Sequence, residues 1–421
     1  MKTLAQALAC LSDYDPRALP VTDAQRVIRA FVEPVAASER VAVRAALGRV
    51  LAEDVISTVN VPAHDNAAMD GWAVRFADLS ADAPAVLTRV GTALAGRPFD
   101  GHVGPGQCVR VMTGAVLPSG ADCVVIQEVT SVEGDAVTIP AGQKLGQHVR
   151  RAGEDLALGK PCLRAGHRVS PADLGLIASL GLAEVRVKRR LRVAFFSTGD
   201  ELASVGESLK PGAVYDSNRY TLWGMLTRLG VELIDMGVVR DDPAALEAAL
   251  REAAQNADAI ITSGGVSVGE ADYTRELLGK LGEAVSWTIA MRPGRPMALG
   301  RIGSAYFFGL PGNPVAVMVT FYEFVRAALL AAAGQTEGLD LPALHVPSQA
   351  PLRKRAGRTE YQRGVLEIDA QGRLSVRVTG QQGSGVLRSM SEANCFIVLE
   401  HERGHVEAGE LVTVQLFEGL V

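Results

Sequence analysis

The chain has 421 residues, of which 48% are hydrophobic, so it is long enough for several domains, because single cores seldom grow beyond about 250 residues. Its 42 basic and 47 acidic residues are well mixed and give a net charge of −5, which argues against nucleic acid or a membrane surface as a partner. The five cysteines are scattered without a CxxC pair, which argues against structural zinc and predicts a cytoplasmic protein.

A helical pattern comes first in the chain. Residues 22–33 place apolar side chains on one helical face, with Thr22 or Asp23 as the cap, and the same period resumes over residues 40–55. We therefore expect the N-terminal part to be helical.

Short β-branched runs replace the helical pattern between residues 58 and 153. CVRVM, CVVIQEV and AVTIP are separated by the turn sequences GRP, PGQ, PSG and VEGD. Runs of this kind between Gly- and Pro-containing turns are typical of strands. We therefore expect an inserted all-β domain over residues 58–153.

Helix signals return at Ser170, which precedes a proline, and end at Gly181. A serine cap with proline at the first helical position starts a helix, and glycine commonly ends one. Together with the N-terminal part, this segment predicts a helical linking domain made of residues 1–57 and 154–190.

Buried strands alternate with amphipathic helices between residues 191 and 338. The strands are VAFFST, VELIDMG, AIITSGG and AYFFGLPG. Asp216 or Ser217 caps the first helix between them and Gly230 ends it, and Asp242, followed by proline, caps the next. This rhythm predicts a central α/β domain with a doubly wound parallel sheet.

The last part of the chain changes from helix to strand. The apolar segment that starts at Pro314 carries Glu323 and Arg326 at its centre, which predicts a buried helix rather than a membrane span. Beyond it, VLEIDAQGRLSVRVTG predicts a hairpin, and CFIVLEH and LVTVQLFE predict further strands. We expect a C-terminal, β-barrel-like domain over residues 339–421.

Small residues follow the strand AIIT in the sequence SGGVSVG. Ligands of open α/β sheets bind at the carboxyl ends of strands, where glycines let backbone N–H groups approach an anion. The loop therefore predicts a phosphate or oxyanion cradle. The alternative is that its glycines only shape a turn.

Acids follow the strand ends of the same sheet: Glu270 and Asp272 after the glycine loop, Glu201 in STGDEL, and Asp241 in GVVRDD. Two further loops add rigidity and positive charge, namely GLPGNP and RPGRP. Two guanidinium groups beside a Pro-Gly turn are suited to gripping an oxyanion. Each feature alone also fits a helix cap or a solvated charge, but together they predict a shared anion and metal site.

Seven segments, spread from about residue 20 to the C-terminus, carry a resemblance to a known family. They are VPAHDNAAMDGWAV, RVMTGAVLPSGADCVV, RRAGED, STGDEL, SGGVSVGEADYT, RPGRP and GLPGNP. They resemble the molybdopterin molybdenumtransferases, the MoeA family that includes the gephyrin E domain. The resemblance implies a four-domain, L-shaped subunit and an enzyme that inserts molybdate into adenylylated molybdopterin with Mg²⁺, releasing AMP. It also implies a homodimer with a cleft shared between subunits, and transient contacts with other proteins of molybdenum cofactor biosynthesis.

The resemblance also implies roles for individual residues. The catalytic set is Asp70, Thr113, Arg150, Asp155, Glu201, Asp241 and Asp272. Asp272, Glu201 and Asp241 of this set are the expected Mg²⁺ ligands. The substrate-binding set is Ser263, Gly264, Gly265, Ser267, Gly269, Arg292, Arg295, Pro311, Gly312, Asn313, Pro314 and Ser384. Without the resemblance, Asp70 reads as a turn residue, and Arg150 with Asp155 as an ordinary ion pair.

Four positions depart from the family pattern. Arg292 and Arg295 stand where lysines are common, Thr288 stands where a further lysine is common, and Ala67 replaces a common serine. Two other functions stay open at this point: the adenylyltransferase that prepares the pterin, whose fold resembles the α/β domain alone, and a non-enzymatic scaffold. The flanking domains argue against the first, and the acids at the strand ends argue against the second.

Overall fold

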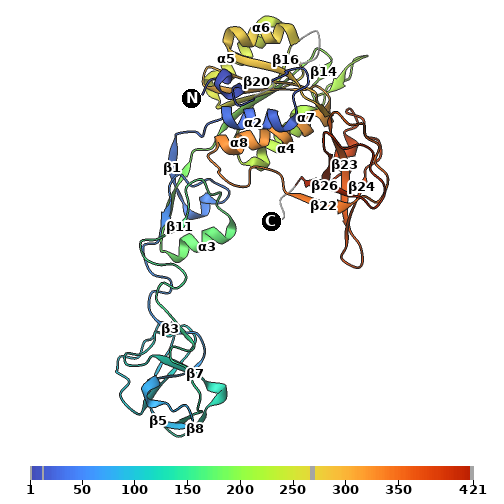
Figure 1. Cartoon of the computed structure of the whole chain (residues 1–421). Coiled ribbons are helices and arrows are strands. Elements are labelled where there is room, and N and C mark those ends of the chain that lie inside the picture. Colours follow the sequence, from blue (N-terminus) through green and yellow to red (C-terminus); the bar gives the residue numbers. More distant parts are fainter. Residues whose placement is uncertain (1, 12–13, 266–270, 418–421) are drawn as a thin grey trace.

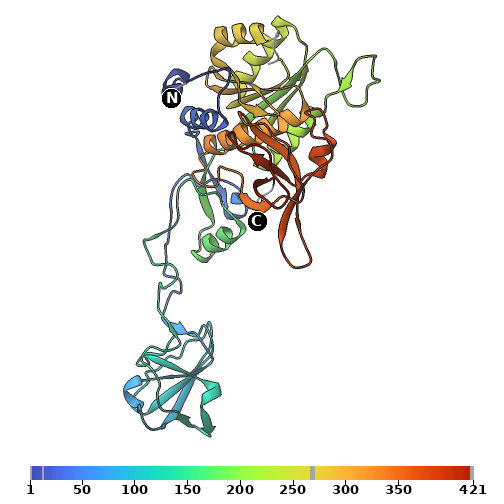
Figure 2. The same cartoon turned by 45° about the vertical axis from the view of Figure 1, so that its right-hand side comes forward.

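The computed structural model describes residues 2–11, 14–265 and 271–417, and for residues 271–275 it describes the backbone alone. The described chain is elongated (Figure 1). An α/β unit and a C-terminal β unit lie side by side at one end, and an all-β unit lies at the other end beyond a narrow linking unit (Figure 2). The multidomain α/β and β architecture predicted from the sequence is therefore confirmed.

Two N-terminal helices pack on the α/β unit. They are α1 (Leu4–Leu8) and α2 (Val21–Phe31), and both contribute buried side chains to its core. Helix α2 confirms the predicted amphipathic helix, but its N-cap is Pro20 and not Thr22 or Asp23, because the helix already begins at Val21.

The linking unit consists of short paired strands and one helix. Its elements are β1 (Ser38–Ala42), the 3₁₀ helix η1 (Val43–Ala46), β2 (Val55–Ile56), β11 (Pro161–Leu163), α3 (Pro171–Ser179) and β12 (Glu184–Lys188). Strand β1 pairs antiparallel with β12, and β2 pairs antiparallel with β11. Ser170 caps α3, and Gly181 follows the helix with φ of +72°, as predicted.

The helix expected over residues 40–55 is wrong, because this segment forms β1, η1 and β2. Its apolar residues Ala46, Leu51 and Val55 are buried, together with Ile177 of α3, in the small core of the linking unit. The local period indicates correctly that these residues are buried. It cannot reveal the pairing of β1 with β12, which is distant in the sequence and satisfies the backbone hydrogen bonds.

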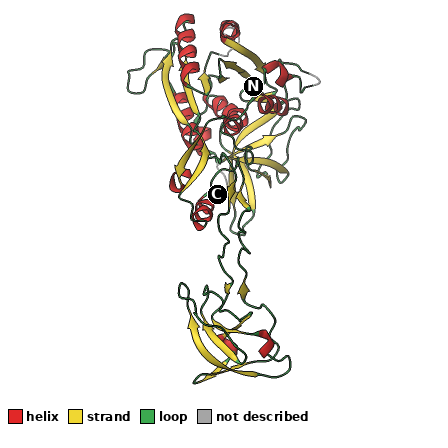
Figure 3. Cartoon of the chain, turned by 90° about the vertical axis from the view of Figure 1, so that its left-hand side faces the viewer, coloured by secondary structure: helices red, strands yellow, loops and turns green. Residues whose placement is uncertain are grey.

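The inserted unit is all-β, as predicted, apart from two 3₁₀ turns (Figure 3). Its elements are β3 (Asn66–Ala67), β4 (Gly71–Val74), η2 (Phe76–Asp78), β5 (Ala85–Ala93), β6 (Gln107–Val111), β7 (Cys123–Ile126), η3 (Gln127–Val129), β8 (Ser131–Glu133), β9 (Ala136–Ile139) and β10 (Val149–Arg150). Six of them form a sheet in the order β7-β4-β6-β5-β9-β8, and β10 pairs with β3. Each face of this sheet buries its own apolar cluster.

The α/β unit contains a six-stranded sheet in the order β16-β13-β17-β21-β20-β18. Its strands are β13 (Arg192–Thr198), β16 (Glu232–Val239), β17 (Ala259–Ser263), β18 (Gly282–Thr288), β20 (Pro296–Ile302) and β21 (Ala305–Leu310). The four strands predicted from the sequence are parallel, and β20 and β18 extend the sheet antiparallel at one edge.

Helices cover both faces of this sheet, as a doubly wound fold requires. They are α4 (Ser217–Leu229), α5 (Pro243–Asn256), α6 (Ala271–Leu281), α7 (Pro314–Thr320) and α8 (Arg326–Ala332), with a small pair of strands, β14 (Leu202–Ala203) and β15 (Val214–Tyr215), before α4. Buried residues of α4, α7 and α8 share one core, and those of α5 and α6 share the core on the opposite face. Asp216 caps α4, Gly230 ends it, and Asp242 caps α5, as predicted.

The segment from Pro314 to Ala332 is a continuous helix in which the π-helical turn η4 (Phe321–Val325) joins α7 to α8. Within the described part of the chain it is the one helix long and apolar enough to cross a membrane, and 78% of its most apolar window is buried inside the fold. This agrees with the prediction of a buried helix.

The sheet of the C-terminal β unit includes one short strand, β19 (Met291–Arg292), from the α/β segment of the chain. Its elements are β19 (Met291–Arg292), β22 (Ala343–Pro347), β23 (Thr359–Ile368), β24 (Leu374–Val378), α9 (Arg388–Glu392), β25 (Cys395–Leu399) and β26 (Leu411–Leu416). The predicted hairpin is formed by β23 and β24. Strand β19 comes from the α/β segment of the chain and pairs parallel with β23, which aligns Arg292 with Glu360. Backbone hydrogen bonds therefore join the two units next to the predicted oxyanion arginines.

Candidate functional site

A cavity of about 770 Å³ lies between the carboxyl ends of β13 and β21 and the C-terminal β unit. It gathers many of the residues singled out from the sequence. Those that line it are Glu201, Arg292, Arg295, Pro311, Gly312, Asn313, Pro314 and Ser384. The position agrees with the rule that ligands of open α/β sheets bind beyond the carboxyl ends of the strands.

Glycines bring two strand-end loops close together at this cavity. Gly264 has φ of +95°, and a Cβ atom there would lie 2.3 Å from the carbonyl oxygen of Thr198. Gly199 has φ of +152°, and a Cβ atom there would lie 2.7 Å from Oε2 of Glu201. Both positions therefore favour glycine, since other residues rarely adopt these backbone conformations. At Gly264 an added Cβ atom would also clash with the backbone of Thr198, whereas the Glu201 carboxylate near Gly199 ends a flexible side chain that can move away.

The N-terminus of α4 holds three strand ends in place. Ser197 Oγ, at the end of β13, donates to Asp216 Oδ1 at 2.9 Å. Asn218 Nδ2 donates to Ser263 Oγ, at the end of β17, at 2.8 Å and to the carbonyl oxygen of Gly312, after β21, at 2.6 Å. Asp216 and Asn218 also line the cavity, although sequence reasoning treated Asp216 only as a cap. The polar sequence DSN at the start of the predicted helix was the available signal.

Three buried oxygen atoms at these strand ends lack a hydrogen-bond partner among the described residues. They are Thr198 Oγ1, Asp216 Oδ2 and Asn218 Oδ1. Buried polar atoms are nearly always paired, so such a group indicates a missing water, ion or ligand. With Glu201 on the cavity wall, the available donors are oxygen atoms, which fits Mg²⁺ better than zinc. Within the described residues, however, no three acidic, histidine or cysteine side chains are grouped closely enough to hold a metal.

Arg292 and Arg295 supply the positive charge of the cavity. Both are exposed, and neither guanidinium group forms an ion pair or hydrogen bond with another described residue. Gly294 between them has φ of +92°, and a Cβ atom there would lie 2.7 Å from Thr320 Oγ1, so the turn fits tightly against α7. The two arginines are thus available to an anion on a fixed turn.

A third arginine, which sequence reasoning missed, lies behind the cavity. Arg363 is 1% exposed, and its guanidinium donates to Ser389 Oγ and to the carbonyl oxygen of Gly383, both at 3.1 Å. Burial, and then the charge of Arg292, lowers the pKa of Arg363 to about 10. Its position next to the predicted hairpin was the only available signal, and burial of an arginine there indicates a function or a partner.

Some predicted residues are not brought to the cavity or lie outside the description. Asp241 is exposed and does not line the cavity, and its backbone N–H lies 3.4 Å from Oδ1 of Asp200. Ser267 and Gly269 lie outside the described residues, as does the side chain of Asp272, whose backbone is at the start of α6. Gly265 is the last described residue before that gap and has φ of +67°. The metal-ligand roles of Asp272 and Asp241 therefore stay predictions.

Asp70 and Thr113 meet each other in the all-β unit, which lies at the opposite end of the molecule from the two units that line the cavity (Figure 1). The backbone N–H and the Oγ1 hydroxyl of Thr113 both donate to Asp70 Oδ1 at 2.7 Å. The hydrogen bond from the Thr113 backbone, followed by that from its hydroxyl, lowers the pKa of Asp70. The two hydrogen bonds hold the Asp70 carboxylate in a fixed, ionised state, and its functional role stays a prediction.

Arg150 and Asp155 lie where the all-β unit meets the linking unit. They do not pair with each other among the described ion pairs, which argues against the ordinary ion pair that the sequence left open. The neighbouring Arg151 instead pairs with Asp65 at 2.6 Å. Arg150 is exposed at the end of β10.

The fold and the cavity define a class of protein: a multidomain α/β protein with a cavity at the carboxyl ends of its parallel strands, where ligands of such sheets bind. Three family descriptions match the chain: MoeA N-terminal region (domain I and II) over residues 19–181, probable molybdopterin binding domain over 194–331, and MoeA C-terminal region (domain IV) over 345–417.

Individual relatives agree with these matches. A molybdopterin molybdenumtransferase from Haemophilus influenzae is 45% identical over 89% of this chain and 93% of its own length. One from Nostoc is 37% identical over 88% of this chain and 86% of its own length. The crystal structure of a molybdopterin biosynthesis moeA protein from Pyrococcus horikoshii superposes with a TM-score of 0.83 at 28% identity, covering 95% of this chain and 100% of that one. The chain belongs to the MoeA family of molybdopterin molybdenumtransferases.

Proposed function

We propose that this protein acts in the cytoplasm in molybdenum cofactor biosynthesis, inserting molybdate into adenylylated molybdopterin with Mg²⁺ and releasing AMP. Family membership supports the activity. The observation that carries the proposal is a cavity lined by Arg292 and Arg295, which have no partner among the described residues, together with the carboxylates Glu201 and Asp216.

The two arginines fit the task of binding molybdate, which is a dianion. Molybdate, the dithiolene sulfurs and the phosphate groups of the substrate repel one another, and a cavity that excludes water strengthens this repulsion. Arg292 and Arg295 would offset it by charge-assisted hydrogen bonds to the oxyanion, and backbone N–H groups of the strand-end loops would add neutral donors. The tight turn around Gly294 would keep both guanidinium groups in position as the reactants enter.

Glu201 and Asp216 are the described residues that would hold Mg²⁺. We propose Asp272 as a further ligand, whereas Asp241 does not line the cavity. When bound, the ion would supply positive charge at the phosphate groups and stabilise the leaving AMP. Asp216 already accepts from Ser197 with one oxygen, so its second oxygen is the one available to the ion.

We propose a homodimer as the functional form. Asp70 and Thr113 are hydrogen-bonded to each other in the all-β unit, which lies at the other end of the molecule from the α/β and C-terminal β units that line the cavity (Figure 2). A second subunit that places its all-β unit over the cavity would bring the two groups together.

Anaerobic incubation with adenylylated molybdopterin, Mg²⁺ and molybdate tests the function. We expect AMP and finished cofactor to appear together, only when molybdate is present. A parallel reaction with ATP and unadenylylated pterin tests for adenylyltransferase activity, and AMP-pterin formation there without cofactor formation in the first reaction would contradict the proposal.

A further inference from the structure

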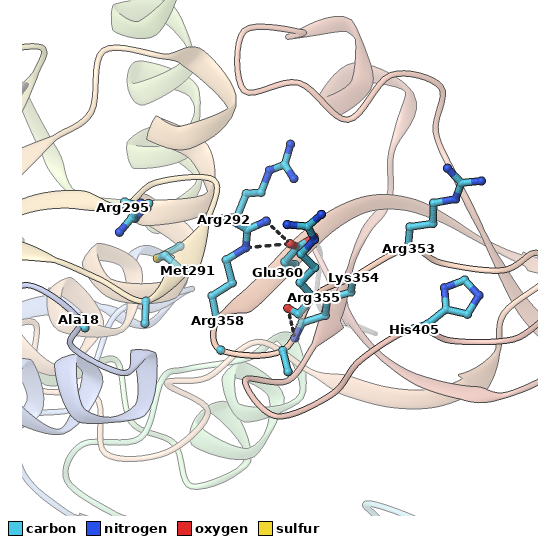
Figure 4. Close-up of a pocket in the computed structure, with 13 residues that line it drawn as sticks. Ala18, Met291, Arg292, Arg295, Arg353, Lys354, Arg355, Arg358, Glu360 and His405 are labelled. Carbon is cyan, nitrogen blue, oxygen red and sulfur yellow. Dashed lines mark hydrogen bonds and ion pairs between the residues drawn. The ribbon is translucent and has the colours of Figure 1, made fainter.

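A second cavity, of about 940 Å³, is also lined by Arg292 and Arg295 (Figure 4). Its other wall is the loop of the C-terminal β unit that precedes β23. The cationic side chains around it are Arg292, Arg295, Arg353, Lys354, Arg355 and Arg358. This is a much higher density of positive charge than the mixed surface of an acidic protein leads one to expect.

Negative charge on the described wall of this cavity comes from one carboxylate, Glu360, which is 5% exposed. Arg358 already neutralises it, with Nη2 at 2.8 Å and Nε at 2.9 Å from the same oxygen. Figure 4 shows this pair at the centre of the cavity. The charges of the remaining cations are therefore not balanced by the wall.

Four guanidinium groups remain without an ion pair or side-chain hydrogen bond among the described residues: Arg292, Arg295, Arg353 and Arg355. They come from two separate units of the fold and line one cavity. Like charges around one cavity repel one another, and an anion among them would reduce the repulsion. Guanidinium groups also present paired donors that match the edges of tetrahedral oxyanions.

The loop that carries Arg353 and Arg355 is held in place from beneath. Lys354 lies between them, is 9% exposed, and donates from Nζ to the carbonyl oxygens of His401 at 3.2 Å and Arg403 at 2.5 Å. The backbone N–H of Gly357 donates to the carbonyl oxygen of His401 at 2.9 Å. The buried lysine thus holds the loop in place, while its two neighbours, Arg353 and Arg355, are exposed and line the cavity.

We propose that this second cavity binds a tetrahedral dianion, the class that includes molybdate, inorganic phosphate and the phosphate group of AMP. Because Arg292 and Arg295 line both cavities, anion binding in one changes the affinity of the other, and the effect is reciprocal. Molybdate or AMP as the natural occupant rests on the proposed function, whereas the anion site itself does not.

The test is the double variant Arg353→Gln/Arg355→Gln in the full-length protein. Both side chains are exposed, so the variant keeps the fold, which an unchanged thermal unfolding midpoint verifies. Calorimetric titrations with molybdate, phosphate and AMP, each alone at fixed ionic strength, measure binding. We expect the double variant to bind at least one of the three anions more weakly at this site than the wild type does, by roughly tenfold or more.

The matched control is Arg373→Gln. Its side chain is 77% exposed, lies in the turn between β23 and β24, and pairs with Asp369, so it removes a charge from the same unit outside the cavity. We expect all three titrations to match the wild type. Weakening by the control equal to that of the double variant would show a general charge effect and overturn the proposal.

The identity of the weakened anion distinguishes the sources. A loss confined to molybdate indicates a substrate site, and a loss with phosphate or AMP indicates a phosphate site. Unchanged binding of all three in the double variant overturns the proposal. AMP release by the wild-type protein is measured in parallel, and its absence would contradict the proposed function while leaving the binding result intact.

Discussion

Arg292 is the residue on which the proposed oxyanion grip depends most directly. Its guanidinium is exposed and unpaired among the described residues, so Arg292→Ala removes no contact that holds the fold. We expect the KM for molybdate to rise about ten- to a hundredfold, since a hydrogen bond to a charged group contributes about 1.5–3 kcal/mol. Initial rates of AMP release over a range of molybdate concentrations measure the change.

Arg292→Lys is the matched control, because it keeps the charge and lacks the fork of donors. We expect it to recover most of the lost affinity, as lysine is common at this position in the family that the sequence resembles. A KM for molybdate in Arg292→Ala equal to that of the wild type would show that this residue does not bind the oxyanion.

Glu323 makes the stability of the protein depend on pH. It is 5% exposed within η4, and Tyr361 donates its hydroxyl to Oε2 at 3.0 Å. Burial raises the pKa of Glu323 from 4.5 to about 7. The folded state binds this proton more tightly than the unfolded state. The protonated carboxyl therefore contributes its full stabilisation of the fold below pH 4.5, and this stabilisation is lost as the pH rises to about 7.

Glu323→Gln keeps the shape and removes the titration. We expect the variant to be more stable than the wild type above pH 7 by up to about 3 kcal/mol, and to lose the wild-type decline between pH 5 and 7. The free energy of unfolding at several pH values measures both. Glu402→Gln, whose side chain is 92% exposed, is the control and should follow the wild-type curve. A parallel decline in Glu323→Gln would mean that another group titrates.

At the scale of elements, the loop after β17 depends on Gly264. Alanine is unfavourable at this position for two reasons. The backbone has a positive φ, and an added Cβ atom would lie 2.3 Å from the Thr198 carbonyl oxygen. We expect Gly264→Ala to lower the free energy of unfolding by about 1–3 kcal/mol and to reduce activity, because the loop must move away from β13. Thermal unfolding and AMP release measure the two effects.

Gly279→Ala is the comparison for this loop. Gly279 lies within α6, and an added Cβ atom there meets nothing within 4 Å. Alanine favours a helix interior over glycine by about 1 kcal/mol, so this variant should be as stable as the wild type or more so. If Gly264→Ala were as stable and as active as the wild type, the close approach of the two strand ends would not be needed for stability or activity.

The elements themselves were predictable where the signal was local. Asp216 with Gly230 and Ser170 with Gly181 mark helix ends by capping chemistry that operates within a few residues, and the structure confirms both helices. The segment of residues 40–55 failed because its strand β1 is stabilised by β12, far along the chain. Strands β18 and β20 were missed for a different reason: they pair with each other and are close in the sequence, but neither alternates between buried and exposed residues, since β20 is buried along most of its length.

At the scale of the whole molecule, the separation of Asp70 from the cavity predicts complementation between subunits. We expect Asp70→Ala and Glu201→Ala to be inactive as separate proteins. In a mixed dimer, however, one site combines the intact all-β unit of one subunit with the intact cavity of the other. Random mixing of equal amounts should therefore recover about a quarter of the wild-type rate of AMP release.

Unfolding and refolding the two variants together, followed by the AMP assay, measures this recovery, and sedimentation confirms the dimer. A mixture of Asp70→Ala with Thr113→Ala is the control, because both changes lie in the same unit and no intact site arises in any dimer. If the mixture of Asp70→Ala with Glu201→Ala stayed inactive while dimers formed, Asp70 and Glu201 would not belong to one shared active site.

The sequence by itself determined the α/β rhythm, the all-β insertion, the family and the loops that carry glycine, acid and arginine, because these depend on local periodicity, turn chemistry and ordered motifs. Only the tertiary structure decided which of them meet. Glu201, Arg292 and Ser384 line one cavity because β19 pairs across the chain with β23, whereas Asp70 and Thr113 lie at the other end of the molecule. It also buried Arg363 and grouped Arg353 and Arg355 with Arg292 around a second cavity. Such convergence depends on long-range pairing and packing, which residues adjacent in the sequence do not encode.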